Sequence, residues 1–263
     1  MSVEYYYDQN PQNEWERLER NKTEYAVTMR AFEEYFPLPP AQVLDIGGGP
    51  GRYSLALAQQ GYDVTLVDVS AQCLKFAREK SEDAGILLTC IHGNALALKF
   101  QRDQFDVVLL MGPLYHLRTE EGRKKALQEA VRVLRKKGLI CASFVTRYAP
   151  IRWAAAFEPD WVMTNNLQCS QIITEGKASL ARESFVNYSY FAHPREINPF
   201  MEESGLESVD LIACEGVISF IDEKVNQLDE DTWKIWVDLN YHLGKDSSIH
   251  GAAEHLLYVG KKK

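Results

Sequence analysis

The residues best suited to bind a ligand lie in one short stretch, residues 43–52, where an apolar run ends in an acid and opens into a glycine-rich loop. A helical pattern begins directly after this loop, so the stretch predicts a strand, a tight turn and a helix, the first unit of a nucleotide-binding α/β sheet. Because glycine has no side chain, its backbone allows a ligand to approach closely. The predicted binding residues are Asp45, Gly47, Gly48, Gly49 and Gly51.

The charge and spacing of this loop indicate a ligand with a cationic end. A dinucleotide fingerprint places its third glycine one position later, where this chain has Arg52. Asp45 stands two residues before the first glycine, and a negative charge there disfavours a docked pyrophosphate. An α-amino group or a sulfonium suits such an acid. The loop therefore favours S-adenosylmethionine over a nicotinamide dinucleotide.

A second acid supports an adenosine ligand. Asp68 ends a predicted strand over 63–68 and lies 17 residues after Gly51, near the ~20-residue offset at which an acid meets the ribose hydroxyls. A carboxylate can accept both hydroxyl protons. Together, the loop and Asp68 resemble the cofactor motifs of the class I S-adenosylmethionine-dependent methyltransferases, and the resemblance covers residues 40–145 well and 195–260 more loosely.

The resemblance implies an α/β fold with a doubly wound, seven-stranded, mostly parallel sheet, whose seventh strand inserts antiparallel beside the fifth. It also implies transfer of a methyl group from S-adenosylmethionine to O, N, S or C. Many relatives carry Gly-Asp-Ala where this chain has Gly93-Asn94-Ala95. The Asn94 oxygen can still accept from the adenine amino group, and the Ala95 backbone can contact the adenine edge. Further cofactor contacts are expected at Val69 and Met111.

The segment Gly112–Leu117 resembles the motif after strand four of small-molecule methyltransferases, and it contains Tyr115 and His116. We expect both near the substrate. The ordinary pKa of histidine lies close to neutral pH, so His116 either takes a proton from the nucleophile as a general base or serves as a hydrogen-bonding residue behind the site.

One domain spanning residues 1–263 must position these residues, because the length fits one domain with an insertion better than two. We divide it into an N-terminal helical lid (1–40), a cofactor-binding core (41–145), a cap insertion (146–195) and a C-terminal part of the sheet with an extra helix (196–263).

The lid is predicted to hold one or two amphipathic helices, with Asn13 and Glu16 as a capping pair and Pro37 as the stop. Tyr6 and Tyr7 either line the entrance to the active site or belong to a frayed tail.

The cap insertion is rich in aromatic residues, and Trp153 is its candidate substrate contact. We predict a helix near 151–158 and a hairpin or mobile loop over 165–184. The rings either bind the substrate or form a small core of the insertion's own.

The remaining elements follow from apolar runs and periodicity. Predicted strands are 43–46, 87–92, 105–111, 139–145, 206–214 and 253–260; predicted helices are 52–60, 71–84, 120–137 and 222–243, with residues 261–263 as a solvated tail.

Composition narrows the classes of function. Hydrophobic residues make up 46% and charged residues 25% of the chain, as in soluble globular proteins. We expect a cytoplasmic protein without a membrane segment or signal peptide, because no apolar run approaches ~20 residues. The five scattered cysteines lack any CxxC pair, so we expect reduced thiols and no metal site.

The net charge of −8 disfavours a large polyanionic partner. We therefore predict a small-molecule acceptor. The alternatives are a methyltransferase acting on a modified tRNA nucleoside, to which the outline of the chain is loosely similar, and a cofactor-binding protein without catalysis. A dehydrogenase is disfavoured by the loop. Either a monomer or a homodimer is compatible with the sequence.

Overall fold

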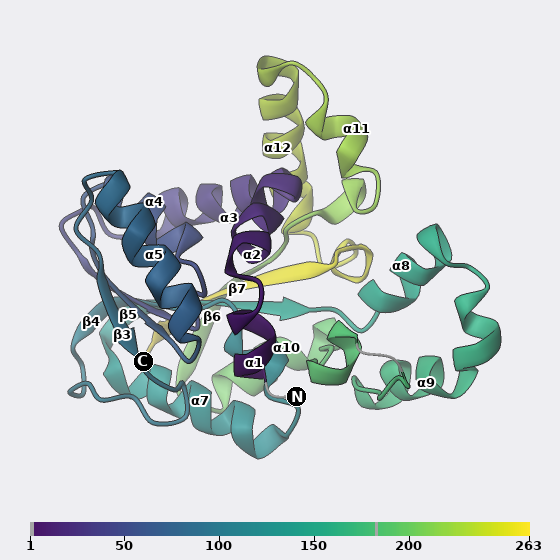
Figure 1. The fold of residues 1–263 in the computed structure, drawn as a ribbon, viewed down its shortest axis with the longest axis horizontal. Coiled ribbons are helices and arrows are strands. Elements are labelled where there is room, and N and C mark those ends of the chain that lie inside the picture. The colour runs from purple at the N-terminus through teal and green to yellow at the C-terminus, as the bar shows by residue number, and fades with distance from the viewer. Residues whose placement is uncertain (1–2, 182–183) are drawn as a thin grey trace.

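A seven-stranded sheet forms the centre of the protein in a computed structural model that describes residues 3–181 and 184–263 (Figure 1). The strand order is β3-β2-β1-β4-β5-β7-β6. Of these strands, β7 alone is antiparallel to its neighbours, β5 and β6, so the predicted sheet is confirmed. The strands are β1 (Gln42–Ile46), β2 (Asp63–Asp68), β3 (Thr89–His92), β4 (Phe105–Leu110), β5 (Leu134–Val145), β6 (Leu206–Ala213) and β7 (His255–Lys262).

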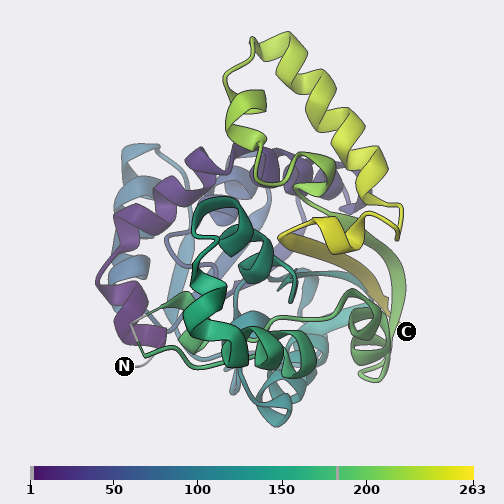
Figure 2. The ribbon, with the colours of Figure 1, turned by 90° about the vertical axis from the view of Figure 1, so that its right-hand side faces the viewer.

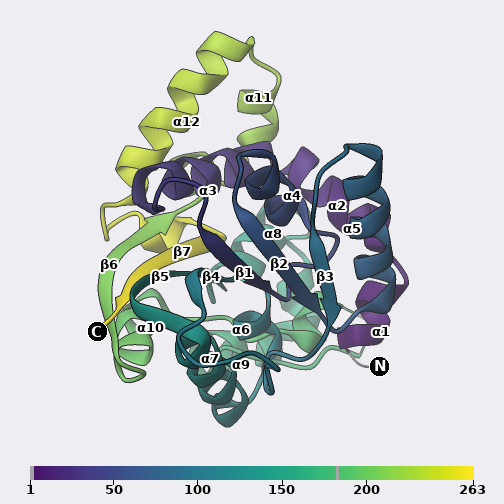
Figure 3. The ribbon, with the colours of Figure 1, turned by 90° about the vertical axis from the view of Figure 1, so that its left-hand side faces the viewer.

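Helices cover both faces of the sheet, as the view along the strands in Figure 3 shows. Two large clusters of buried side chains lie on the two faces of the sheet. In one, Phe32, Leu57 and Tyr241 pack against the strands, and in the other, Leu127 and Met201 pack against the opposite face. On the first face lie α3 (Lys22–Tyr35), α4 (Arg52–Gln59), α5 (Ala71–Asp83) and the end of α12 (Glu230–Gly244); on the second lie α7 (Glu120–Val133) and α10 (Pro194–Glu202).

The N-terminal segment lies across the carboxyl ends of the strands as α1 (Val3–Asp8) and α2 (Pro11–Arg20) (Figure 1). The Asp8 carboxylate fastens α1, because its Oδ1 accepts from Ser70 Oγ at 2.6 Å and from the Gln72 amide at 3.2 Å. The predicted Asn13 cap is wrong, since Asn13 lies inside α2. The helix begins at Pro11, whose missing N–H costs nothing in a first turn.

Residues 146–181 and 184–195 form a part of the molecule around α8 (Ala149–Phe157) and α9 (Trp161–Glu175) that projects at the right of Figure 1 and faces the viewer in Figure 2. The helix predicted near 151–158 is confirmed. The hairpin or loop predicted from residue 165 is wrong as far as residue 175, because α9 buries Ile172 and Cys169 and ends at Gly176 in the left-handed region. Residues 182–183 of that prediction lie outside the described residues.

Several other boundaries differ from the predictions, among them the start of β3, which is Thr89 and not residue 87. The helix expected to reach residue 137 ends at Val133, because the chain joins β5 at Leu134 and bulges before Leu139 pairs with Val107. The helix expected over 222–243 is divided into α11 (Asp222–Asn226) and α12, which Asp229 caps by accepting from the Thr232 amide. Lys262 belongs to β7, and its ammonium donates to Asp103.

The short connecting helices are α6 (Pro113–His116), η1 (Phe185–Tyr188), η2 (Gly216–Ile218) and η3 (His250–Ala252). Among the described helices, none combines the length and the apolar character needed to cross a membrane.

Candidate active site: two adjoining cavities

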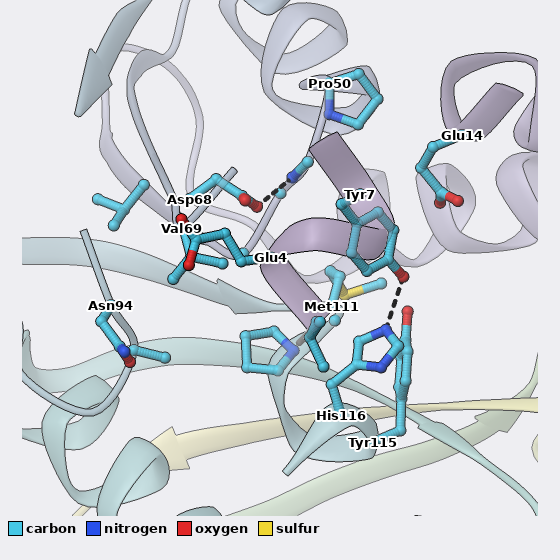
Figure 4. Close-up of a pocket in the computed structure, with 18 of the residues that line it drawn as sticks. Glu4, Tyr7, Glu14, Pro50, Asp68, Val69, Asn94, Met111, Tyr115 and His116 are labelled. Carbon is cyan, nitrogen blue, oxygen red and sulfur yellow. Dashed lines mark hydrogen bonds between the residues drawn. The ribbon is translucent and has the colours of Figure 1, made fainter. Parts of the chain in front are cut away.

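A cavity of about 310 Å³ lies at the carboxyl ends of β1, β2 and β4, beneath α1 and α2 (Figure 4). Loops at this edge of a parallel sheet form the usual ligand crevice of α/β folds. We call it the first cavity. Of the residues predicted from the sequence, its lining includes Gly47, Gly48, Gly49, Asp68, Val69, Asn94, Ala95, Met111, Tyr7, Tyr115 and His116.

The glycine loop forms one wall of the first cavity with bare backbone. A Cβ atom on Gly48 would lie 2.3 Å from Asp45 Oδ2 and 2.6 Å from Leu66 Cδ1, so no larger residue fits. A Cβ atom on Gly49 would meet nothing within 4 Å and would occupy open space at the cavity wall. Gly51 does not line the cavity; it begins α4 with a φ of 83° and packs against Ala77 and Leu66.

Asp45 lies behind the loop instead of in the cavity lining. Its Oδ2 accepts from Ser54 Oγ at 2.7 Å, while its buried Oδ1 has no partner among the described residues. Burial raises the pKa of this carboxyl to about 7, and the charge of Asp68 adds to the effect. Asp45 therefore supports the loop from behind Gly48, and its carboxyl is only partly ionised at neutral pH.

Asp68 stands at the end of β2 with both carboxylate oxygens anchored. Its Oδ2 accepts from the Gly49 amide and its Oδ1 from the Ser70 amide, each at 2.8 Å (Figure 4). Burial raises the pKa of Asp68, while these backbone donors oppose that shift. Each oxygen keeps a second lone pair for a ligand hydroxyl.

Asn94 uses part of its acceptor capacity locally. Its Oδ1 accepts from the Leu96 amide at 2.9 Å, which holds the loop after β3 in a turn. The predicted contact to an adenine amino group must therefore use the second lone pair of this oxygen.

Tyr7 and His116 close the first cavity from opposite sides. The Tyr7 hydroxyl lies 2.7 Å from His116 Nε2, and His116 Nδ1 lies 3.3 Å from the Tyr188 carbonyl oxygen (Figure 4). A carbonyl oxygen only accepts, so we assign the ring hydrogen to Nδ1, and Tyr7 donates to Nε2. Burial lowers the pKa of His116 to about 4. The imidazole is thus neutral near pH 7, with both nitrogens engaged.

A second cavity of about 400 Å³ adjoins the first. The two cavities share the lining residues Tyr7, Glu14, Arg17 and Tyr115. Tyr6 and Trp153, predicted as substrate contacts, line the second cavity, whereas His116 lines only the first. Further rings in its wall are Trp161, Phe185 and Phe191.

Charged residues form one side of the second cavity. Arg17 donates to Glu14 at 2.9 Å and to Glu24 at 2.7 Å. His255 Nδ1 lies 2.6 Å from Glu215 Oε1 and 3.8 Å from Glu24. These carboxylates raise the pKa of His255 to about 9 against the effect of burial, so the imidazole is a cation at neutral pH.

Glu24, Glu215 and His255 present ligand atoms within 4.8 Å of one another. Each of the three nevertheless already bonds to protein: Arg17 holds Glu24, while the amides of Glu254 and His255 donate to Glu215. The cluster is thus stabilised by internal hydrogen bonds.

Of the charged residues in these linings, Asp68 was predicted from the sequence, whereas those that line the second cavity were not. Glu14 and Arg17 could have been found from the sequence, because they form an i,i+3 pair beside the apolar stripe of a helix. Glu254 and His255 could also have been found, because they stand at the start of an apolar strand, at the carboxyl edge of the sheet. Glu24 and Glu215 have no local signal, because only the fold brings residues so distant in sequence together.

The first cavity fits S-adenosylmethionine on two observations. The space beside Gly49 is one that a side chain would fill, and Asp68 presents a carboxylate at the end of β2. The residues that would hold the cofactor are the glycine loop, Asp68, Val69, Asn94, Ala95 and Met111.

Comparison with known proteins agrees with this geometry. Residues 43–138 match a family model described as a methyltransferase domain. The ubiquinone/menaquinone biosynthesis C-methyltransferase UbiE of Edwardsiella ictaluri is 36% identical over 103 residues, which are 37% of this chain and 39% of that protein. A glycine/sarcosine N-methyltransferase of Aphanothece halophytica is 33% identical over 38% of each chain. The chain thus matches about two fifths of the length of these curated relatives.

Solved structures extend the likeness in fold beyond the matched segment. A structure described as a SAM-dependent methyltransferase from Methanosarcina mazei superposes with a TM-score of 0.62 at 16% identity, covering 88% of this chain and 96% of that one. The chain therefore has the class I S-adenosylmethionine-dependent methyltransferase fold. Within this fold, residues 43–138 are similar to a methyltransferase domain, and the cofactor of that class is S-adenosylmethionine.

Proposed function

We propose that the protein transfers a methyl group from S-adenosylmethionine to a small molecule held in the second cavity. The observation that carries this proposal is the junction of the two cavities at Tyr7, Glu14, Arg17 and Tyr115. A donor in the first cavity would meet an acceptor in the second across these residues, and such alignment provides most of the acceleration in this chemistry.

When bound, S-adenosylmethionine supplies an already activated methyl group on a sulfonium. The chain's own part is to bind, orient and exclude water. Asp68 is anchored to accept from the ribose hydroxyls, and the Gly48 backbone allows close approach. Helix α1, held in place by the hydrogen bonds of Asp8 and Tyr7, covers the first cavity and excludes water from it.

His116 acts in this proposal as a positioning residue. Its Nε2 accepts from Tyr7 and it does not line the second cavity. To serve as a general base it would have to receive a proton through the Tyr7 hydroxyl. The simpler role is to hold Tyr7, and with it α1, over the first cavity.

The preference for a small acceptor rests on the size and charge of the protein. A volume of about 400 Å³ fits the range of small-molecule pockets, and the net charge of −8 opposes a nucleic acid. Both curated relatives have names of small-molecule methyltransferases, but their alignments cover only the part of the chain that forms the donor side. The acceptor must therefore be sought from the second cavity.

The test is formation of S-adenosylhomocysteine by the full chain with S-adenosylmethionine and a panel of metabolite acceptors. We expect turnover with at least one small acceptor, and a loss of turnover in Asp68→Asn. Binding of S-adenosylmethionine without turnover on any acceptor would favour a binding protein. Binding of bulk tRNA that falls steeply with salt would favour the nucleic-acid alternative.

A further inference from the structure

One carboxylate in the wall of the second cavity, that of Glu254, forms no direct ion pair among the described residues and reaches the Arg152 guanidinium only through the Ser219 hydroxyl. We propose that the acceptor carries a protonated amine and that Glu254 binds this ammonium group. The inference rests on the proposed function, because it names the chemical class of the molecule in the second cavity.

Glu254 lies directly before β7 and is half-buried. Its Oε1 accepts from Ser219 Oγ at 3.2 Å, and Ser219 in turn accepts from Arg152 at 3.4 Å. Its Oε2 has no hydrogen-bond partner within residues 3–181 and 184–263. Since the residue lines the second cavity, this oxygen is available to a donor there.

The other charged groups around the cavity are already paired. Arg17 is held by Glu14 and Glu24, and His255 by Glu215. A buried carboxylate without a cation is costly, so a ligand that supplies the missing positive charge is favoured.

The balance of charges around the second cavity also favours an ammonium ligand. The charged residues that line this cavity are Glu14, Glu254, Arg17 and His255, and Glu24, Glu215 and Arg152 interact with them from behind. With every group ionised, four carboxylates face three cations, an excess of one negative charge. An ammonium ligand neutralises that excess, whereas a carboxylate or phosphate ligand would add to it.

Burial raises the pKa of Glu254 to about 7, with further contributions from Glu215 and Glu24 that His255 opposes. A cationic ligand beside Glu254 favours the ionised form. Binding of an amine near pH 7 should therefore release a fraction of a proton from the protein.

Aromatic rings supply the remainder of the binding surface. Tyr6, Tyr115, Trp153 and Phe185 line the same cavity as the charged side chains. Their faces attract cations and cover apolar groups. The site thus suits a compact amine with an apolar body.

The experiment compares probes of matched shape by calorimetry on the full chain saturated with S-adenosylhomocysteine. The probes are 2-phenylethylamine, 2-phenylethanol and phenylacetate, with 3-phenylpropylamine and cyclohexylmethylamine as further amines. We expect at least one amine to bind roughly tenfold or more tightly than the alcohol, with proton release at pH 7 and no measurable binding of phenylacetate.

Glu254→Gln should remove that preference and the proton release while leaving the affinity for S-adenosylhomocysteine unchanged. Glu254→Asp, which keeps the charge, should retain the preference. Glu207→Gln is the matched control, because it removes the same charge from an exposed position in β6. Should Glu254→Gln fail to fold, the comparison of Glu254→Asp and wild type across the probes still decides.

The inference is overturned if the alcohol or the carboxylate binds as well as the amines, if no amine binds, or if Glu254→Gln retains the preference. The proposed function is tested separately by the S-adenosylhomocysteine titration that precedes the probes. Tight binding of that compound without amine preference removes only the amine inference, whereas its failure to bind removes the proposed function.

Discussion

The two cavities are built by different means. The first is lined by loop backbone after β1, β2 and β4, and at Gly48 and Gly49 its wall consists of backbone alone. The second is lined by side chains that converge from α1, α2, α8, η1 and the start of β7. Backbone geometry suits a cofactor common to many enzymes, whereas side chains from separate segments can be exchanged to change an acceptor.

The two histidines of the site show the same contrast in charge. His116, at the first cavity, is buried without an anionic partner, and its pKa is lowered to about 4. His255, at the second, lies between Glu24 and Glu215, and its pKa is raised to about 9. The first cavity is thus closed by a neutral ring and the second contains a fixed cation.

The largest expected effect comes from placing a methyl group on the loop. In Gly48→Ala the new Cβ would overlap the Asp45 carboxylate at 2.3 Å and Leu66 at 2.6 Å, so the loop must shift. We expect S-adenosylmethionine affinity to fall by roughly 100-fold or more, measured by calorimetry. Gly251→Ala is the control, since its Cβ would make only an ordinary contact with the Tyr148 ring at 3.6 Å and the residue does not line the first cavity. Unchanged affinity in Gly48→Ala would contradict a wall of bare backbone.

Asp68→Asn should have the next largest effect. The replacement amide would turn an N–H donor toward the Gly49 or Ser70 amide, both of which now donate to Asp68. The mismatch and the lost charge should weaken cofactor binding by roughly 10- to 100-fold. Asp63→Asn, at the exposed opposite end of β2, is the matched control. Equal affinities for the two variants would remove Asp68 from the binding site.

The contrast between the cavities also explains how far the sequence could predict the structure. The glycine loop, Asp68 and the apolar strands are local signals, so the sheet and the first cavity were accessible from residues 43–117. A local sequence pattern cannot show that Arg17, Glu24, Glu215 and His255 lie together. Their contact depends on the position of β7 between β5 and β6.

Helix α9 was missed for a related reason. Its polar run, with Thr164, Asn165, Ser170 and Gln171, is typical of a loop. The helix forms because Ile172 is buried in the small cluster with Val145 and Phe191, and Cys169 on the same helix is buried as well. Tertiary packing thus overrode local propensity, as is common for helices of weak amphipathicity.

The histidines should separate in their pH dependence of stability. A lowered pKa at His116 contributes stability above pH 6.5 that is lost as the pH falls through about 4. A raised pKa at His255 contributes stability that is complete below pH 6.5 and lost as the pH rises through about 9. Each contribution is about 3 kcal/mol.

Urea unfolding of His116→Gln and His255→Gln at pH 5, 7 and 9.5 tests this difference. We expect His255→Gln to be most destabilised relative to wild type at pH 5 and 7, and less so at pH 9.5. Relative to wild type, the free energy of unfolding of His116→Gln should be highest at pH 5. Parallel pH profiles for the two variants would show that the two rings do not differ in charge.

The smallest expected effect is that of Trp153→Ala. This variant distinguishes the two cavities, because it should weaken binding in the second cavity and leave binding in the first unchanged. The indole lines the second cavity but is 41% exposed, so its removal should create little strain. We expect binding of 2-phenylethylamine to weaken by roughly threefold, as for a partly exposed cation–π contact, while S-adenosylhomocysteine affinity stays at the wild-type value. Phe157→Ala, on the same helix and 59% exposed, does not line the second cavity and should change neither. If Trp153→Ala weakened both ligands equally, the two cavities would form a single binding site, and the separation of a backbone-built donor side from a side-chain-built acceptor side would be wrong.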